Sequence, residues 1–319
     1  MKTRIVILNY NGESMMKQCL PSVLKAVQTS RYDIAVTILD NGSSDGSEKY
    51  VKSEFPMFEY IHAPSNDFLC SFNAYAQTIN EDAMFLLNND LKLDEGFCDP
   101  MIEAMTSDDE VFFCAPKSMT FDGASYEGSL SRCELRKGLI WGSARFPGHE
   151  RIIDNDSITM QCGFGLFRRE YFLKLGGYDD LYLPGTLEDT DLCFRGYENG
   201  WKGLYCHRSI CFHMGQASFG KAFGSSGITR INTRNRHLFM YKNIDSVHLW
   251  FQYGIWFPLH FLKYLLGGSP AEILGFKDAV KMLPSALKRR RIKRRLKPVV
   301  NDYQVFQISK SIGSDTYGK

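Results

Sequence analysis

The chain has 319 residues, of which 44% are hydrophobic and 23% are charged, and its formal net charge is +2. This composition excludes wholesale disorder, and the length allows one large domain or one domain with a substantial appendage. The charge is unevenly distributed. Residues 288–297 hold eight basic residues and no acidic one, which leaves 30 basic and 36 acidic residues elsewhere, a net charge of −6.

The first 120 residues predict short strands that alternate with helices. The predicted strands are residues 5–8, 34–39, 60–62, 83–87 and 111–115, and the predicted helices end near residues 27, 55 and 79. Pro21 is expected to kink or restart the first helix. Alternation of this kind predicts right-handed βαβ units, and so an α/β fold with a mostly parallel central sheet and helices on both faces.

Polar side chains stand where three of these strands end. Asn9 ends the first strand, Asp40 the second, and Asn88, Asn89 and Asp90 the fourth. Ligands of parallel sheets bind beyond the carboxyl ends of the strands. We therefore expect these residues to share one crevice.

The middle of the chain is less regular. Residues 119–157 are expected to form an inserted, irregular loop region, followed by a strand over 157–167 and a short helix over 169–175. A further helix begins at Glu188 and Asp189 and ends at Asn199 and Gly200. The glycine-rich segment 215–227 predicts a mobile lid, with a plain surface loop as the alternative.

The C-terminal region has a different character. Residues 247–266 are rich in Leu, Phe, Trp, Tyr and Ile, but they include too many polar residues for a lone membrane span. With the amphipathic stretch 273–287 and the basic run, they predict a helical pair that lies on an anionic membrane surface. A solvated or partner-binding face is the alternative, and we expect no nucleic acid.

The cysteines and the N-terminus suggest where the chain resides. The nine cysteines include no C-x-x-C spacing, which favours reduced thiols and a cytoplasmic protein. The apolar run at residues 5–8 is far too short for a signal peptide.

Several short motifs occur in an order that resembles the family 2 glycosyltransferases, which have the GT-A fold, and within them a bacterial rhamnosyltransferase-like branch. The resemblance covers residues 1–243 and leaves 244–319 as a helical, polybasic C-terminal region. The motifs are Ile-Leu-Asn-Tyr-Asn-Gly at 7–12, Leu-Asp-Asn-Gly-Ser-Ser-Asp-Gly-Ser at 39–47, Leu-Leu-Asn-Asn-Asp at 86–90, Gly-Gly-Tyr-Asp at 176–179, Glu-Asp-Thr-Asp-Leu at 188–192 and His213.

The resemblance implies a pocket for the nucleotide of a sugar donor. Asp40 would accept the imide N–H of uracil or thymine, since a carboxylate is an acceptor only. Asn9, Asn11 and Asn66 would line the same pocket. Where the family has glycine before phenylalanine this chain has Asp67, which departs from the family's backbone path. The alternative for the segment around Asp40 is a plain helix-entry turn.

A divalent cation, Mg²⁺ or Mn²⁺, is implied by residues that stand at the family's Asp-x-Asp position. Asp90 would be a metal ligand, Asn88 and Asn89 would contact the nucleotide, and His213 would be the second protein ligand. The cation would neutralise the leaving diphosphate. A strand-end turn and a structural histidine are the alternatives, and the nearby Cys206, His207 and Cys211 fit no structural zinc pattern.

Further polar residues are expected around the reaction centre. Arg234 and Arg236 would add cationic contacts to the donor. The resemblance makes Asp189 the base that takes the proton of the acceptor hydroxyl, with Glu188 orienting the acceptor or Asp189. Asp191 would stabilise the helix N-terminus. Alternatively, all three acids only complement the helix dipole.

Together these residues predict an inverting, metal-dependent glycosyltransferase that moves a sugar from a UDP- or dTDP-sugar to a surface-polysaccharide or lipid-linked glycan acceptor. We expect it to be cytoplasmic and peripheral on the inner face of the cell membrane. The loss of the family's first acid at Asn88 leaves a membrane-associated scaffold with a degenerate sugar-nucleotide pocket as an alternative. A nucleotidyltransferase is a further alternative, but its basic, glycine-rich phosphate loop is missing after the first strand.

Overall fold

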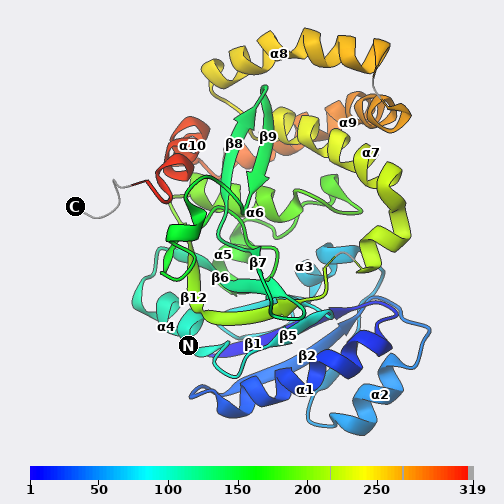
Figure 1. Cartoon of the computed structure of the whole chain (residues 1–319), viewed down its shortest axis with the longest axis vertical. Coiled ribbons are helices and arrows are strands. Elements are labelled where there is room, and N and C mark those ends of the chain that lie inside the picture. The colour runs from blue at the N-terminus through cyan, green and yellow to red at the C-terminus, as the bar shows by residue number, and fades with distance from the viewer. Residues whose placement is uncertain (216, 268, 315–319) are drawn as a thin grey trace.

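The computed structural model describes residues 1–215, 217–267 and 269–314, and a ten-stranded sheet surrounded by helices forms its centre (Figure 1). The strands of this sheet are β1 (Thr3–Asn9), β2 (Ile34–Asp40), β3 (Glu59–His62), β4 (Ala83–Asn88), β5 (Leu91–Leu93), β6 (Val111–Thr120), β7 (Tyr126–Gly128), β10 (Ser157–Ile158), β11 (Gly165–Arg168) and β12 (Lys202–His213). A separate hairpin pairs β8 (Arg132–Arg136) with β9 (Leu139–Ser143).

The helices cover the sheet and then form the C-terminal region. They are α1 (Glu13–Thr29), α2 (Ser47–Glu54), α3 (Ser71–Tyr75), α4 (Asp99–Ser107), α5 (Arg169–Lys174), α6 (Glu188–Glu198), α7 (Ala217–Asn243), α8 (Val247–Leu266), α9 (Pro270–Arg295) and α10 (Asp302–Ser311), with short 3-10 turns η1 (Phe68–Cys70), η2 (His149–Arg151) and η3 (Asp180–Tyr182).

The predicted α/β fold with a mostly parallel sheet is confirmed. Strands β3, β2, β1 and β4 are parallel neighbours, and β6 and β12 form a second parallel pair. Alternate side chains of these strands enter two separate cores: Ile5 and Phe85 lie in one, Val6 and Leu86 in the other. Burial on both faces explains why the strands are continuous apolar runs.

The region expected to be irregular, residues 119–157, contains three strands instead. Strand β7 pairs with β6, and β8 and β9 form the hairpin. The hairpin turns through Lys137 and Gly138, whose φ angles are 51° and 74°. Two consecutive positive φ values fit a tight hairpin turn, where asparagine or aspartate is the usual residue before glycine. Lysine at that position hides the signal in the sequence.

Other predicted elements differ in extent. The strand expected over 157–167 is two strands, β10 and β11, which pair with different neighbours. The helix expected from residue 68 is the short turn η1 followed by α3, and α3 ends at Tyr75.

The prediction that Pro21 kinks or restarts the first helix was wrong, whereas the predicted lid stays a prediction. Helix α1 runs through Pro21 without a break. Because proline has no N–H, the carbonyl of Lys17 loses its helical donor, but Pro21 and Lys17 are both on the exposed side of the helix. The segment expected as a lid is largely helical, since α7 begins at Ala217, but a kink interrupts the helix at Gly224, where φ is 59° and ψ is 173°. Gln216, within the expected lid, lies outside the described residues.

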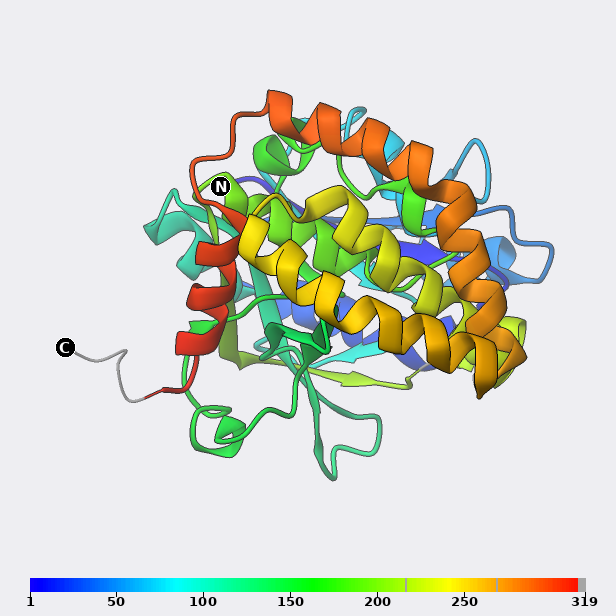
Figure 2. The ribbon, with the colours of Figure 1, turned by 90° about the horizontal axis from the view of Figure 1, so that it is seen from above.

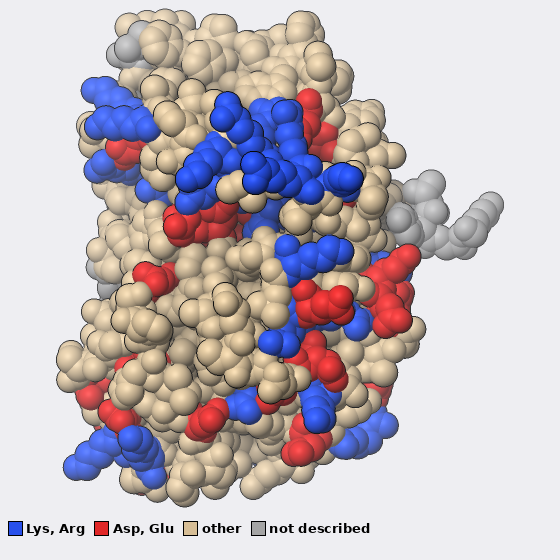
Figure 3. All heavy atoms as spheres, turned by 180° about the vertical axis from the view of Figure 1, so that it is seen from behind, with Lys and Arg blue, Asp and Glu red and all other residues tan. Residues whose placement is uncertain are grey.

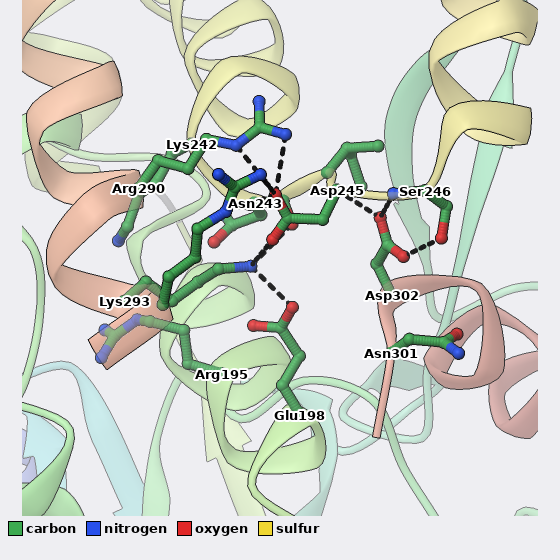
Figure 4. Close-up of polar contacts among 12 residues, drawn as sticks. Arg195, Glu198, Lys242, Asn243, Asp245, Ser246, Arg290, Lys293, Asn301 and Asp302 are labelled. Atoms are coloured by element: carbon green, nitrogen blue, oxygen red, sulfur yellow. Dashed lines mark hydrogen bonds and ion pairs between the residues drawn. The ribbon is translucent and has the colours of Figure 1, made fainter. Parts of the chain in front are cut away.

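The C-terminal helices pack onto the body of the protein. Helix α9 lies along α7, and seen from above α8 is the outermost element (Figure 2). The Lys293 Nζ atom donates to Glu198 Oε1 at 2.6 Å and to the carbonyl of Asn243 at 2.7 Å, and Arg290 pairs with Asp245 at 2.7 Å (Figure 4). None of the described helices combines the length and apolarity that crossing a membrane requires.

Candidate active site

Three strand ends meet at one edge of the sheet, as the sequence predicts for Asn9, Asp40 and Asn89. The Asn9 amide donates to Asp40 Oδ1 at 3.1 Å, and its oxygen accepts from the Asn89 amide at 2.7 Å. Asp40 is only 1% exposed. The parallel register places Asn9 beside Asp40 and Leu8 beside Asn88, so the contacts follow directly from the strand order β2-β1-β4.

Gly12 lies against this group, and the contact requires glycine. A Cβ atom at Gly12 would lie 1.9 Å from the Asn89 amide nitrogen and 2.5 Å from Asn9 Oδ1. A side chain would therefore push the amides apart. Just before it, Asn11 Oδ1 accepts the backbone N–H of Ser44 at 2.8 Å, which ties the turn after β1 to the turn after β2.

The Asp40 carboxylate has close neighbours that the sequence did not indicate. Its Oδ2 atom accepts from the backbone N–H of Ser43 at 2.9 Å and lies 3.4 Å from His62 Nδ1, at the end of β3. Asn66 is exposed, and its oxygen accepts from the N–H of Phe68 at 3.3 Å within its own loop. Phe68 has a φ of 51°, a conformation that follows the unusual Asp67.

Asp90 and His213 come together across the sheet. Strand β5, which directly follows Asp90, pairs antiparallel with the end of β12, and His213 Nε2 lies 3.5 Å from Asp90 Oδ2. Glu127 of β7, missed in the sequence because its region was read as loop, lies 2.9 Å from His213 Nδ1. Burial lowers the pKa of His213, but hydrogen bonds to Asp90 and Glu127 outweigh it and raise the pKa to about 9.

This pair has the chemistry to hold a divalent cation. The Asp90 Oδ1 atom is buried without a hydrogen-bond partner in the described part of the chain. An ionised Glu127 can only accept a hydrogen bond, so it keeps a proton on Nδ1 of His213 and leaves Nε2 of His213 facing Asp90. Many metal-binding histidines are oriented by a second carboxylate in this way. Within the described residues no group of three or more acids, histidines and cysteines is arranged for a metal. A cation here would take its other ligands from a diphosphate and water.

Glu188 and Asp189 open helix α6 after an unusual backbone segment. Thr186 and Leu187 have φ angles of 69° and 68°, which are strained for residues other than glycine. Asn235, fully buried on α7, stabilises this segment: its amide donates to the carbonyls of Gly185 and Thr186, both at 2.8 Å. No pattern in the sequence indicates this role for Asn235.

One oxygen of Asp189 is held and the other is left without a partner. Oδ1 accepts from the backbone N–H of Thr190 at 2.6 Å. Oδ2 has no hydrogen-bond partner among the described residues and lies beside Gly163, where a Cβ atom would be 3.6 Å away. The next residue, Phe164, contacts His213, with ring centroids 5.2 Å apart. Residues 163 and 164 therefore connect Asp189 to the Asp90–His213 pair.

The two acids at the start of α6 have raised pKa values because both are buried. Burial and the neighbouring charge of Asp189 raise the pKa of Glu188 to about 8, and burial also raises the pKa of Asp189. The Glu188 Oε2 atom is buried without a partner among the described residues, which fits a protonated carboxyl. Glu188 thus holds a proton at neutral pH, beside an acid in position to receive one.

This shift makes stability depend on pH. Between pH 5 and 8 the unfolded chain has lost the Glu188 proton while the folded chain keeps it, so stability falls as pH rises. Each unit of pKa shift corresponds to about 1.4 kcal/mol. We therefore expect the free energy of unfolding of Glu188→Gln, minus that of the wild type, to be larger at pH 8 than at pH 5 by a few kcal/mol. Urea unfolding at both pH values measures this. Parallel pH profiles for the two proteins would contradict it.

The two arginines expected at the donor have other partners. The Arg234 guanidinium donates to the carbonyls of Tyr182 and Leu183, at 3.2 and 2.5 Å, just before the Glu188–Asp189 step. Arg236 lies over the Trp141 ring at 4.2 Å, and burial lowers its pKa. Both contacts stabilise the loops and the hairpin around the site, and contact of either arginine with the donor stays a prediction.

A separate cavity of about 610 Å³ lies between α9 and the loop that contains the Gly-Gly-Tyr-Asp motif. Four cationic side chains line it, and each is paired with a carboxylate: Arg195, Lys242, Arg289 and Lys293. Asp90, Asp189 and His213 do not line it. Its charges are balanced, so it does not have the character of a diphosphate site.

The sheet, its strand-end polar groups and the C-terminal helices define a GT-A fold. The family model Glycosyl transferase family 2 matches residues 4–176, and the chain belongs to this family. A search of curated proteins found no match.

Solved structures share this fold at low sequence identity. GalNAc-T7 with UDP, GalNAc and Mn²⁺ has a TM-score of 0.59 and 16% identity over 89% of this chain, which spans 56% of that protein. TarS 1-349 of S. aureus has a TM-score of 0.56 and 12% identity, over 98% of this chain and 91% of that one. The mannosyltransferase PcManGT from Pyrobaculum calidifontis, with GDP-Man and Mn²⁺, has a TM-score of 0.52 and 10% identity, over 93% and 86%.

Proposed function

We propose that this chain is an inverting, metal-dependent glycosyltransferase that uses a nucleotide-diphosphate sugar. The observation that carries the proposal is a continuous series of contacts from Asp40 through Asn9 and Asn89 to Asp90 and His213, and on through residues 163 and 164 to Asp189. This series of contacts supports the proposal that a base pocket at Asp40, a place for a cation at Asp90 and His213 and the free oxygen of Asp189 border one site.

The residues have distinct roles in the proposed transfer. Asp40 accepts the imide N–H of a uracil or thymine base, which favours a UDP- or dTDP-sugar. Asp90 and His213 hold Mg²⁺ or Mn²⁺, and Asn88 contacts the nucleotide. When bound, the cation neutralises the charge that develops on the leaving diphosphate. Two solved structures of this fold are described with Mn²⁺, which supports a divalent cation.

Asp189 completes the reaction as the general base. The acceptor oxygen attacks the anomeric carbon, the bond from that carbon to the diphosphate oxygen breaks, and Oδ2 of Asp189 takes the hydroxyl proton. The Thr190 N–H holds the other oxygen in place. A protonated Glu188 limits the negative charge beside Asp189 and orients the acceptor or Asp189 itself.

The acceptor and the location of the enzyme belong to the same proposal. A rhamnosyltransferase-like enzyme that transfers a hexosyl or deoxyhexosyl group would build a surface polysaccharide or a lipid-linked glycan. Such acceptors suit an enzyme that is cytoplasmic and peripheral on the inner face of the cell membrane. The polybasic region over residues 244–319 is then the part that contacts the membrane, apart from the catalytic domain over 1–243.

The cation site gives a test of this function by calorimetry. With Mn²⁺ present, we expect Asp90→Asn to weaken UDP binding by more than Glu127→Gln does, because Asp90 is proposed to touch the cation and Glu127 only orients His213. Loss of such an orienting partner typically costs about 10–100-fold in metal affinity. Without Mn²⁺, the wild type and both variants should bind UDP with similar, low affinity.

A screen of nucleotide sugars for Mn²⁺- or Mg²⁺-dependent hydrolysis and transfer completes the test. Activity that EDTA abolishes supports the proposal, whereas metal-independent activity contradicts its cation site. Metal-dependent UDP binding without hydrolysis or transfer of any donor would favour the scaffold with a degenerate pocket, for which the neutral Asn88 is the motivating residue.

A further inference from the structure

The outer side of α8 carries an uninterrupted apolar row. Its members recur every three or four residues and so share one helix face. Val247, Phe251 and Leu266 are 83%, 67% and 79% exposed. The full row is Val247, Phe251, Ile255, Leu259, Leu262 and Leu266. The opposite face, which includes Leu249, Tyr253 and Tyr264, is buried against the protein.

Helix α8 also contains His248, Gln252, His260 and Lys263, so it is apolar on two faces and not around its whole circumference. Here only the inner half is covered, and a contiguous exposed apolar surface of this kind marks an interaction site. No described helix can cross a membrane, α8 included. A helix of this type instead lies flat, with its apolar face in the boundary between lipid headgroups and acyl chains.

Unpaired positive charge accompanies the row. Six exposed Lys and Arg residues on and just after α9 have no acidic partner in the described chain: Lys277, Lys281, Lys288, Arg291, Arg295 and Lys297. The two acids of α9 are both paired, Glu272 with Lys263 at 2.5 Å and Asp278 with Arg230 at 2.6 Å. Lys and Arg gather high on the face seen in Figure 3.

The hairpin tip extends this region. Lys137 is exposed, and its Nζ atom lies 5.9 Å from the centre of the Trp256 ring. Its carbonyl oxygen lies 2.8 Å from His260 Nε2. The tip therefore adds a cation beside α8. Four members of the basic run are excluded from this surface role because carboxylates already bind them: Arg289, Arg290, Lys293 and Arg294.

We propose that the α8 row and the six unpaired cations form one docking face for a membrane that contains anionic lipid headgroups. The apolar row enters the headgroup boundary, and the cations bind the phosphate charge. A second copy of the chain fits less well, because it would bring the same positive charges together. This inference rests on the proposed membrane placement and not on the transfer chemistry.

Sedimentation of the full chain with lipid vesicles tests the docking face. We expect the wild type to sediment with vesicles of phosphatidylcholine and phosphatidylglycerol, and far less with phosphatidylcholine alone. Phe251→Asp with Ile255→Asp should lower the partition coefficient at least tenfold, and so should Lys288→Glu with Arg291→Glu. Met57→Asp is the matched control, since Met57 is an apolar residue 62% exposed on the far body and should have no effect.

Each other result overturns the proposal. These are a wild type that binds neither kind of vesicle or both equally, a Phe251–Ile255 variant that binds as the wild type does, or a dimer in light scattering that this variant dissociates. Thermal melting of the variants, all at exposed positions, confirms that they fold. The vesicle assay contains no sugar donor and so does not depend on the transfer reaction. A chain that binds vesicles but transfers no sugar in the donor screen would contradict the proposed function and leave the docking face supported.

Discussion

Replacing Asp189 by asparagine should abolish turnover while leaving donor binding intact. Asparagine keeps the shape and the acceptor oxygen that bonds the Thr190 N–H, but it cannot take a proton at Oδ2. Loss of a positioned general base typically lowers the rate by about 10²–10⁴-fold. Steady-state kinetics should therefore show a fall in kcat of this size, with KM for the donor changed little.

The control separates loss of the base from loss of the site. UDP affinity in the presence of Mn²⁺, measured by calorimetry, should remain within about twofold of the wild type, because the proposed diphosphate ligands are untouched. Asp109→Asn, at a carboxylate whose side chain is 96% exposed, should retain full activity. Full activity in Asp189→Asn would show that another group takes the proton.

The parallel half of the fold was predictable because its signals are local. The runs that become β1, β2 and β4 are apolar without alternation, and the polar residues that follow them mark the edge where ligands bind. Asn9, Asp40 and Asn89 could be grouped from chain order alone. The contacts between them then follow from the register of neighbouring strands.

The rest of the site depends on contacts between distant segments. Glu127 reaches His213 only because β7 pairs with β6 and β6 with β12, and a three-residue strand carries too weak a pattern to detect. Asn235 lies 49 residues after Thr186 in the chain, and its amide holds the segment before Glu188 by hydrogen bonds. Such bonds produce no periodic pattern in the sequence. Neither role can be inferred without the fold.

The basic run shows how composition misleads about surface charge. Its eight cations suggested one polybasic membrane anchor, but Lys293 is 3% exposed and paired with Glu198, and Arg289 pairs with Asp179 at 2.6 Å. These partners lie about 100 residues away in the chain. Part of the run therefore joins α9 to the body, and the membrane contact we propose shifts to α8 and the remaining cations.

Asp191 differs in the same way from its expected role. The sequence assigned it to the helix dipole, but its fully buried carboxylate is the centre of an ionic network. Lys242 Nζ donates to both of its oxygens at 2.7 and 2.8 Å, Arg195 Nε donates at 2.7 Å and the Asn243 amide at 2.8 Å. Arg195 lies on α6, whereas Lys242 and Asn243 lie at the end of α7.

Replacing Asp191 by asparagine should therefore be strongly destabilising. The substitution leaves Arg195 and Lys242 buried with too little negative charge, and breaking a buried pair by removing one partner costs about 3–5 kcal/mol. We expect the free energy of unfolding in urea to fall by this amount, with a decrease in Tm on the order of 10 °C. The same network fixes the start of α6, so residual activity should also fall.

The control and the pH dependence make this prediction specific. Asp180→Asn breaks the ion pair with Arg289 of helix α9, where the Asp180 carboxylate is 65% exposed, and exposed pairs contribute only about 0–1 kcal/mol. Burial raises the pKa of Asp191, but the charges of Lys242 and Arg195 outweigh it and lower the pKa. A lowered pKa gives stability that is present above the unfolded value, about 3.9, and is lost as pH falls through the folded value. The difference in the free energy of unfolding between the wild type and Asp191→Asn should thus be constant from pH 5 to 7 and shrink in stronger acid. A difference that grows with acidity would show that the network does not stabilise an ionised Asp191.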